Sequence, residues 1–126
     1  MTVLLASLAG GVGAVMRFVV DSLVGRRNRF QLPLGTLLVN VTGSLLLGLV
    51  VGWATHASAG DAVTVRTILG TGFCGGYTTF STASVEGVRL WLAEGSGRAV
   101  THAVVMLVGS VLAAALGLAL GAGLGG

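Results

Sequence analysis

Four long apolar segments, separated by short polar interruptions, limit the fold of this chain more than any other feature. The segments cover about residues 2–24, 33–55, 62–92 and 99–121. A helix needs roughly 20 apolar residues to cross the hydrocarbon core of a bilayer, so four crossings use nearly all of the 126 residues. With 54% hydrophobic and 9% charged residues, the chain is too apolar for a soluble domain. We therefore predict an all-α protein with a single four-span domain in the plasma or inner cell membrane.

The third apolar segment is too long for one regular span and contains an interruption near residues 75–79. Its centre reads Gly72-Phe73-Cys74-Gly75-Gly76-Tyr77-Thr78-Thr79-Phe80-Ser81-Thr82. Adjacent glycines beside adjacent threonines favour local unwinding. Unwound backbone at membrane depth is tolerated only inside protein or beside a polar cavity, and its carbonyl groups are natural cation ligands. The sequence thus predicts a broken third helix with a polar site beside it.

A stripe of polar residues runs along one face of the second span. Thr36, Asn40 and Ser44 are spaced by four residues, so a helix places them on the same side. Their amide and hydroxyl donors are suited to replace part of the hydration shell of an anion, but hydrogen bonding between helices explains the stripe equally well. Phe80, just after the break, has a ring edge that is able to face an anion, although such rings more often pack.

The arginines are divided unequally between the two predicted sides of the membrane. Five lie on or near the side that holds the first and third connections, one lies on the opposite side, and one lies inside the first span: Arg26, Arg27, Arg29, Arg89 and Arg98, then Arg66, then Arg17. The positive-inside rule makes the first side cytoplasmic and places both termini outside. The bias predicts one committed orientation.

Charged groups near the spans are expected to form ion pairs. Arg17 is costly inside a span unless it is paired, and Asp21, one turn further along, is its predicted partner. Glu86 and Arg89 are predicted to form a second pair near the membrane interface. These arginines follow membrane topology and do not indicate nucleic-acid binding. Neither metal-ligand spacing nor a nucleophile with a nearby base is present in the sequence, so we do not predict an enzyme.

Glycine is frequent inside the spans, which predicts close contacts between helices. Small residues allow helix backbones to approach each other in lipid. A compact bundle or dimer follows from this. The glycines concerned are Gly10, Gly11, Gly13, Gly43, Gly48, Gly109, Gly117 and Gly121.

Together, several of these motifs resemble the Fluc/CrcB fluoride channels over essentially the whole chain. The motifs are Gly10-Gly11-Val12-Gly13-Ala14 with Arg17, Gly35-Thr36-Leu37-Leu38-Val39-Asn40 with Gly43, and the stretch from Gly72 to Ser84. The resemblance implies an antiparallel dimer of four-helix subunits that exports fluoride passively, lowering cytoplasmic fluoride. It also implies two narrow pores and a structural sodium ion, Na+, at the dimer interface.

The resemblance also assigns roles to individual residues. Asn40 matches the pore asparagine, and Phe80 matches the first of two pore phenylalanines. Further pore candidates are polar: Thr36, Ser81 and Thr82, together with Ser110 in the fourth span. Gly75 and Thr78 match the positions whose backbone carbonyls hold sodium.

Two departures from the family pattern leave alternatives open. Ala83 stands where the second phenylalanine is expected, and the fourth span has few polar residues beyond Ser110. With the arginine bias, these losses favour a pore-impaired subunit of a heterodimer, paired with an oppositely oriented homologue, about as strongly as a homodimer. A small proton-coupled multidrug-type exporter is the main rival class, and a non-transporting assembly subunit is a third.

Overall fold

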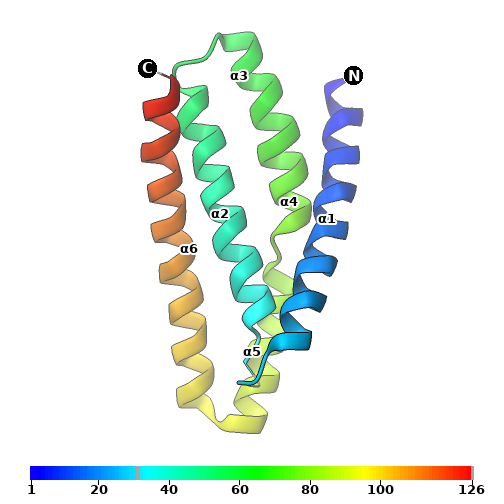
Figure 1. Ribbon diagram of the computed structural model, residues 1–126, viewed down its shortest axis with the longest axis vertical. Helices are drawn as coiled ribbons and strands as arrows, with labels where there is room; N and C mark the ends of the chain where they lie inside the picture. The colour runs from blue at the N-terminus through cyan, green and yellow to red at the C-terminus, as the bar shows by residue number, and fades with distance from the viewer. Residues whose placement is uncertain (31, 126) are drawn as a thin grey trace.

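The computed structural model describes residues 1–30 and 32–125, where all regular structure is helical. The elements are α1 (Thr2–Arg27), α2 (Leu34–Ala54), α3 (Ala59–Val65), η1 (Arg66–Cys74), α4 (Gly75–Tyr77), α5 (Phe80–Glu94) and α6 (Ser96–Gly125). Three of these, α1, α2 and α6, are long and apolar enough to cross a membrane alone. The other four follow one another along a third, interrupted crossing (Figure 1). The prediction of an all-helical fold with a broken third helix is confirmed.

The crossings alternate in direction, so the connections gather at two ends of the bundle. Both termini and the α2–α3 connection lie at one end, and the α1–α2 and α5–α6 connections lie at the other (Figure 1). We call the second the arginine-rich end, because Arg26 and Arg27 finish α1 and Arg98 lies in the first turn of α6. Arg66 begins η1, on the side of the break toward the opposite end. The structure therefore separates these arginines along the long axis of the bundle.

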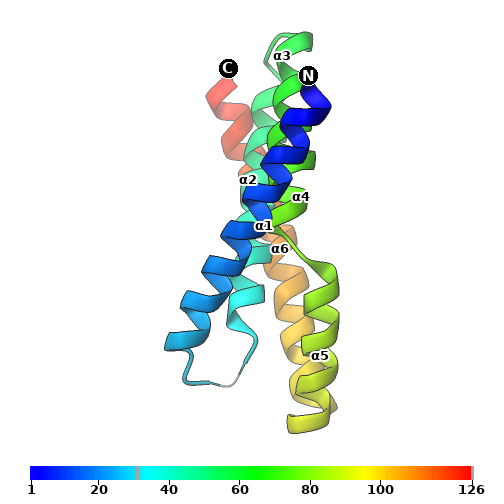
Figure 2. The ribbon, with the colours of Figure 1, turned by 90° about the vertical axis from the view of Figure 1, so that its right-hand side faces the viewer.

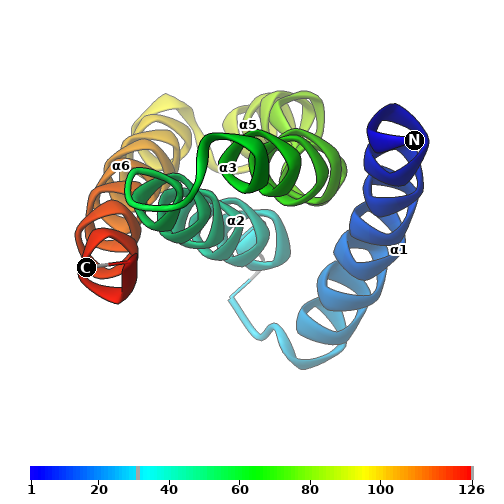
Figure 3. The ribbon, with the colours of Figure 1, turned by 90° about the horizontal axis from the view of Figure 1, so that it is seen from above.

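The four crossings do not surround a single closed core. Seen from above, α1 and α6 lie on opposite sides, with α2 and the interrupted crossing between them (Figure 3). Beyond the break, α5 diverges from the lower part of α1 (Figure 2). Residues 59–94 are long enough, at about 1.5 Å per helical residue, to exceed the roughly 30 Å hydrocarbon core. This length explains why the third apolar segment is too long for one straight span.

Glycines bring α2 and α6 into direct backbone contact. A Cβ atom on Gly48 or Gly52 would overlap the backbone of α6, and one on Gly117 or Gly121 would overlap the backbone of α2. The spacing of four puts each pair on one helix face, which is the small-residue packing typical of membrane helices. The predicted close contact is therefore present at Gly48, Gly117 and Gly121. It is absent at Gly11, where a Cβ would meet nothing within 4 Å.

A second glycine contact joins α1 to η1 and α4. A Cβ on Gly13 would overlap the Phe73 carbonyl oxygen, and one on Gly76 would overlap the Gly10 carbonyl oxygen. Gly72 packs in the same way against Ala6 of α1. These glycines allow close approach of the two helices and are not unwound. The break begins at Thr78, after the last of these glycine contacts.

The helix before the break is itself widened. Residues 66–74 follow a π-helical path, in which hydrogen bonds reach five residues along the chain, and Gly75 to Tyr77 return to an α-helical turn. π-helical turns are rare and often occur at functional sites. The broken third helix predicted near residues 75–79 is confirmed, but the glycines of that stretch, Gly75 and Gly76, are not unwound. Both are helical, and the extended residues are Thr78 and Thr79.

The ion pairs expected from sequence are not formed. In residues 1–30 and 32–125, the one ion pair joins Arg98 to Glu94 at 2.9 Å across the turn at Gly95. Gly95 has a φ of 91°, a left-handed conformation that favours glycine. Asp21 packs instead against the start of α2, where its carboxylate occupies the space that a Cβ on Gly35 would need. Helix α1 therefore anchors to α2 without an Arg17–Asp21 pair.

The α1–η1 contact yields a test with a matched control. We expect Gly13→Ala to reduce the stability of the folded protein by about 1–3 kcal/mol, because its methyl group enters the backbone of η1 and α4. Gly11→Ala changes the same helix where nothing lies within 4 Å and should stay within about 0.5 kcal/mol of the parent. Thermal unfolding in detergent measures both. Equal stability of the two variants would contradict the packing described above.

Candidate functional site

The interrupted crossing is broken by two extended residues. Thr78 has φ −77° and ψ 158°, and Thr79 has φ −149° and ψ 125°. The Thr79 hydroxyl caps α5 by accepting a hydrogen bond from the Thr82 N–H at 3.2 Å, and it donates to the Thr82 hydroxyl at 3.1 Å. Threonine at an N-cap favours a helix start because its oxygen pairs with an exposed amide. The sequence after the break therefore specifies the start of α5.

The side chain of Asn40 pairs with the backbone of the break in both directions. Its Nδ2 group donates to the Thr79 carbonyl at 2.9 Å, and its Oδ1 atom accepts from the Thr79 N–H at 2.8 Å. A continuous α-helix would direct that N–H to the carbonyl of Gly75. Asn40 thus replaces a lost helical partner and leaves the Gly75 carbonyl available. The second Nδ2 hydrogen faces Met106 Sδ at 3.4 Å, and a thioether is a weak acceptor.

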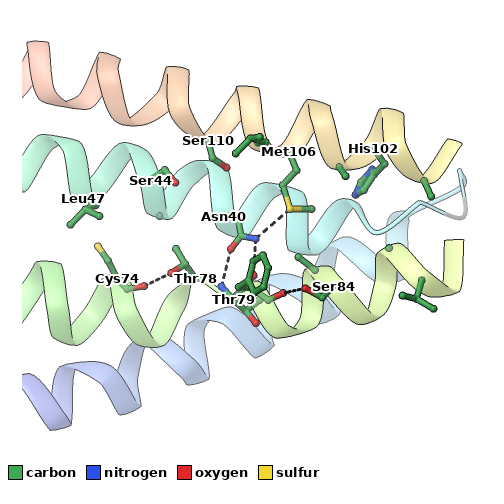
Figure 4. Close-up of a pocket in the computed structure, with 18 of the residues that line it drawn as sticks. Asn40, Ser44, Leu47, Cys74, Thr78, Thr79, Ser84, His102, Met106 and Ser110 are labelled. Carbon is green, nitrogen blue, oxygen red and sulfur yellow. Dashed lines mark hydrogen bonds between the residues drawn. The ribbon is translucent and has the colours of Figure 1, made fainter. Parts of the chain in front are cut away.

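An open groove of about 910 Å³ runs beside the break. Helices α2 and α6 form one wall, and the interrupted crossing forms the other (Figure 4). Its lining is mainly apolar, with polar side chains placed on both walls: Asn40, Ser44, Thr78, Thr79, Ser84 and Ser110. Polar groups among membrane helices are costly and usually face cavities or protein, so this groove is the candidate site.

The residues predicted from sequence divide into two groups in the structure. Asn40, Phe80 and Ser110 line the groove together, and the ring of Phe80 is 88% exposed. The second group does not line it. Thr36 is buried at 2% exposure, and Ser81 and Thr82 are drawn toward the N-cap hydroxyl of Thr79. The structure thus brings together three of the six pore candidates.

Both positions proposed for sodium also line the groove. Gly75 and Thr78 lie at the end of the half-helix formed by η1 and α4, beside the open space. The carbonyl end of a helix carries partial negative charge, and the amide end of the next helix carries partial positive charge. The break therefore places a site suited to a cation directly before one suited to an anion. Among the residues that the structure describes, acidic, histidine and cysteine side chains do not cluster in a way that could bind a metal ion.

A second hollow of about 460 Å³ continues the groove toward the end that holds the termini. The two hollows share Leu47, Gly70 and Thr71. The second also reaches Arg66, an exposed residue at the start of η1. The groove and its continuation therefore extend from α5 and α6, past the break, to a positively charged residue.

Several residues of the site are not found by sequence reasoning. Thr79, Met106 and His102 join the groove in the structure, and none of the three is among the pore residues predicted from sequence. The spacing of His102, Met106 and Ser110 by four residues is a signal that they share one face of α6. Which face meets the groove depends on the packing of α6 against α2.

The pairing of Asn40 with Thr79 predicts a loss of stability on substitution. Asn40→Leu leaves the Thr79 N–H and carbonyl without their partner, which we expect to cost about 1–3 kcal/mol for each buried group. Ser44→Ala removes a polar group one turn along α2 and serves as the matched control. Thermal unfolding compares the two variants. An Asn40→Leu protein as stable as the parent would show that Asn40 does not support the break.

Comparison with known proteins identifies the family. Residues 4–121 match the family described as CrcB-like protein, Camphor Resistance (CrcB). Fluoride-specific ion channel FluC 2 of Cutibacterium acnes is 54% identical over 123 residues, covering 96% of this chain and 98% of the relative. Fluoride-specific ion channel FluC 1 of Leifsonia xyli subsp. xyli is 48% identical, covering 96% and 87%. Fluoride-specific ion channel FluC 2 of Bacillus thuringiensis is 35% identical, covering 94% and 95%. The chain therefore belongs to the CrcB family of multi-pass membrane proteins.

Proposed function

We propose that this chain is a subunit of a fluoride-selective channel that lets fluoride leave the cell passively. The observation that carries the proposal is the groove beside the broken crossing, with Asn40, Phe80 and Ser110 on its walls. The near-full-length similarity to proteins named fluoride-specific ion channels supports it. Because those relatives are named as channels, the comparison favours a channel over an enzyme or a proton-coupled exporter.

A channel for a strongly hydrated anion must replace water with protein groups that bind it weakly enough to release it. The groove supplies the amide of Asn40, the hydroxyl of Ser110 and the ring edge of Phe80. Asn40 remains able to contribute, because its second Nδ2 hydrogen faces only the sulfur of Met106. An anion that displaces this weak contact gains a donor while the two hydrogen bonds to Thr79 persist.

The N-terminal end of α5 supplies further attraction for an anion. Half-helices that begin at membrane depth direct their positive ends toward anionic groups. Ser81 and Thr82 lie in this first turn, bonded to the hydroxyl of Thr79. We propose that they contribute through the helix end and through reorientation of their hydroxyl groups, with Thr36 supporting the second span from its buried position.

The carbonyls before the break fit a bound sodium ion. Sodium prefers oxygen ligands, and unwound carbonyls at half-helix ends are its usual ligands in membrane proteins. Gly75 faces open space, and its carbonyl has lost the Thr79 N–H to Asn40. We propose that the carbonyls of Gly75 and Thr78 hold a structural sodium ion. When bound, the ion supplies positive charge at the centre of the assembly.

A second subunit is part of the proposal. Two carbonyl groups are too few to replace the hydration shell of a cation, so a second chain is needed to contribute the same pair. It also covers the exposed ring of Phe80, which forms half of the expected aromatic pair. The arginine bias places the arginine-rich end of this chain in the cytoplasm. An antiparallel dimer therefore needs an inverted copy or an inverted homologue, with two pores between the subunits.

Export through such a pore needs no energy coupling. An inside-negative membrane potential drives an anion outward with about 2.3 kcal/mol per 100 mV. The channel only has to admit fluoride and exclude the other cellular anions. Passive flow distinguishes this mechanism from an exporter that depends on a proton gradient.

The first test is fluoride efflux from sodium-containing liposomes that hold the purified chain alone. We expect rapid efflux of fluoride, no efflux of chloride and no requirement for a proton gradient. Efflux would establish a homodimeric channel that tolerates Ala83. Absence of efflux from folded protein would contradict the homodimer and favour the heterodimer, in which co-reconstitution with the inverted homologue restores flow.

The pore role of Phe80 predicts a selective loss of flow. Phe80→Leu should lower fluoride flux by at least about tenfold, because removing one transition-state contact of roughly 1.4 kcal/mol has that effect. Phe18→Leu makes the same change at an exposed ring on α1 and should leave flux unchanged. Liposome efflux compares the variants at equal protein density. Equal flux through the two variants would remove Phe80 from the pore.

Removal of sodium tests the proposed cation site. Replacing sodium by a large organic cation should lower both fluoride flux and the melting temperature. A ligand present at a hundred times its Kd stabilises the folded state by about 2.7 kcal/mol, so the shift should be readily measured. Unchanged stability and flux without sodium would contradict a structural sodium ion.

A further inference from the structure

Two titratable side chains on the neighbouring helices α5 and α6 each hold a buried polar atom without a hydrogen-bond partner. Oε2 of Glu86 and Nε2 of His102 are both shielded from solvent, and neither has a partner in the described part of the chain. The Glu86 carboxylate is close enough to act electrostatically on the His102 ring, although the two do not form a direct ion pair. Buried polar atoms are normally paired, so two orphaned atoms on facing helices call for an explanation.

Few other charged side chains lie on the helices that pack around Glu86 and His102. Helix α2, which packs against α6, carries no acidic, basic or histidine residue between Leu34 and Ala54. On α5 and α6 the other charged groups are Arg89, which is exposed, and the ion pair of Glu94 with Arg98. The paired charges cancel each other. The charge of this region therefore depends on how many protons Glu86 and His102 hold.

The pair also lies beside the proposed anion path. His102 lines the groove and lies one turn from Met106, which contacts Asn40 (Figure 4). With one proton the pair is neutral in total, with two protons it carries one positive charge, and with none it carries one negative charge. A negative charge beside the path repels an anion strongly in a medium of low dielectric constant.

We propose that Glu86 and His102 together hold one exchangeable proton, and that its loss places a negative charge beside the groove and slows anion passage. Interacting groups of this kind release protons as a unit rather than as separate residues. The proton acts as a regulator of a passive channel and is not transported with the anion. The effect of pH on flux rests on the proposed function, whereas the shared proton does not.

The experiment measures fluoride efflux in symmetrical buffers between about pH 5 and pH 8, a range that extends below the usual histidine titration because His102 is partly buried. We expect wild-type flux to fall by about tenfold across this range, because one unit charge appears near the path. Glu86→Gln combined with His102→Gln removes both titratable groups of the pair, so the flux of this double variant at pH 8 should equal its flux at pH 5. His56→Gln alters the other histidine, which is exposed beyond the end of α2, and should keep the wild-type profile.

A second measurement follows the proton directly. The chain has two histidines, so NMR titration of histidine-labelled protein, with His56→Gln for assignment, reports His102 alone. Its titration midpoint should shift by about one pH unit or more when Glu86 is replaced by Gln. An unchanged midpoint, a pH-independent wild-type flux, or a pH profile retained in the double variant would each overturn the inference. Absence of fluoride flux at every pH would instead overturn the proposed function, and the titration alone would then decide whether the proton is shared.

Discussion

The structure depends on one requirement, that every backbone polar group inside the membrane finds a partner within the protein. A continuous helix meets this requirement by itself, but a broken helix does not. Here the interruption at Thr78 and Thr79 is compensated by Asn40, whose amide pairs with both backbone groups of Thr79. The side chain that permits the break also stands in the groove beside it. Stability and the proposed transport therefore share one residue.

Glycine contacts determine where the groove can form. Gly48 with Gly117 joins α2 to α6, and Gly13 with Gly76 joins α1 to the interrupted crossing. In lipid there is no hydrophobic driving force between helices, so such close backbone packing holds them together. These contacts join the helices in two pairs. The space between the pairs stays open along the break, and its polar lining is available to a solute or a second subunit.

The position of the break shows what local sequence patterns can and cannot predict about a helix. The sequence indicated an interruption near residues 75–79, where adjacent glycines precede adjacent threonines. In the structure, Gly76 instead meets Gly10 across the helix contact, and the threonines are extended. Glycine permits both unwinding and close approach, so the residue type alone cannot distinguish them. The neighbouring helix decides which of the two occurs.

The sequence by itself determined the four apolar segments, the all-helical class, the separation of arginines along the chain and the family. These properties follow from hydropathy, charge and motifs, which depend on the order of residues and not on which residues meet in the folded protein. Only the tertiary structure decided that Asn40 bonds Thr79, that Asp21 packs on Gly35 rather than pairing with Arg17, and that Glu86 and His102 each bury an unpaired polar atom. Hydrogen bonds and ion pairs depend on distances of a few ångströms between side chains, and packing of helices far apart in sequence sets those distances.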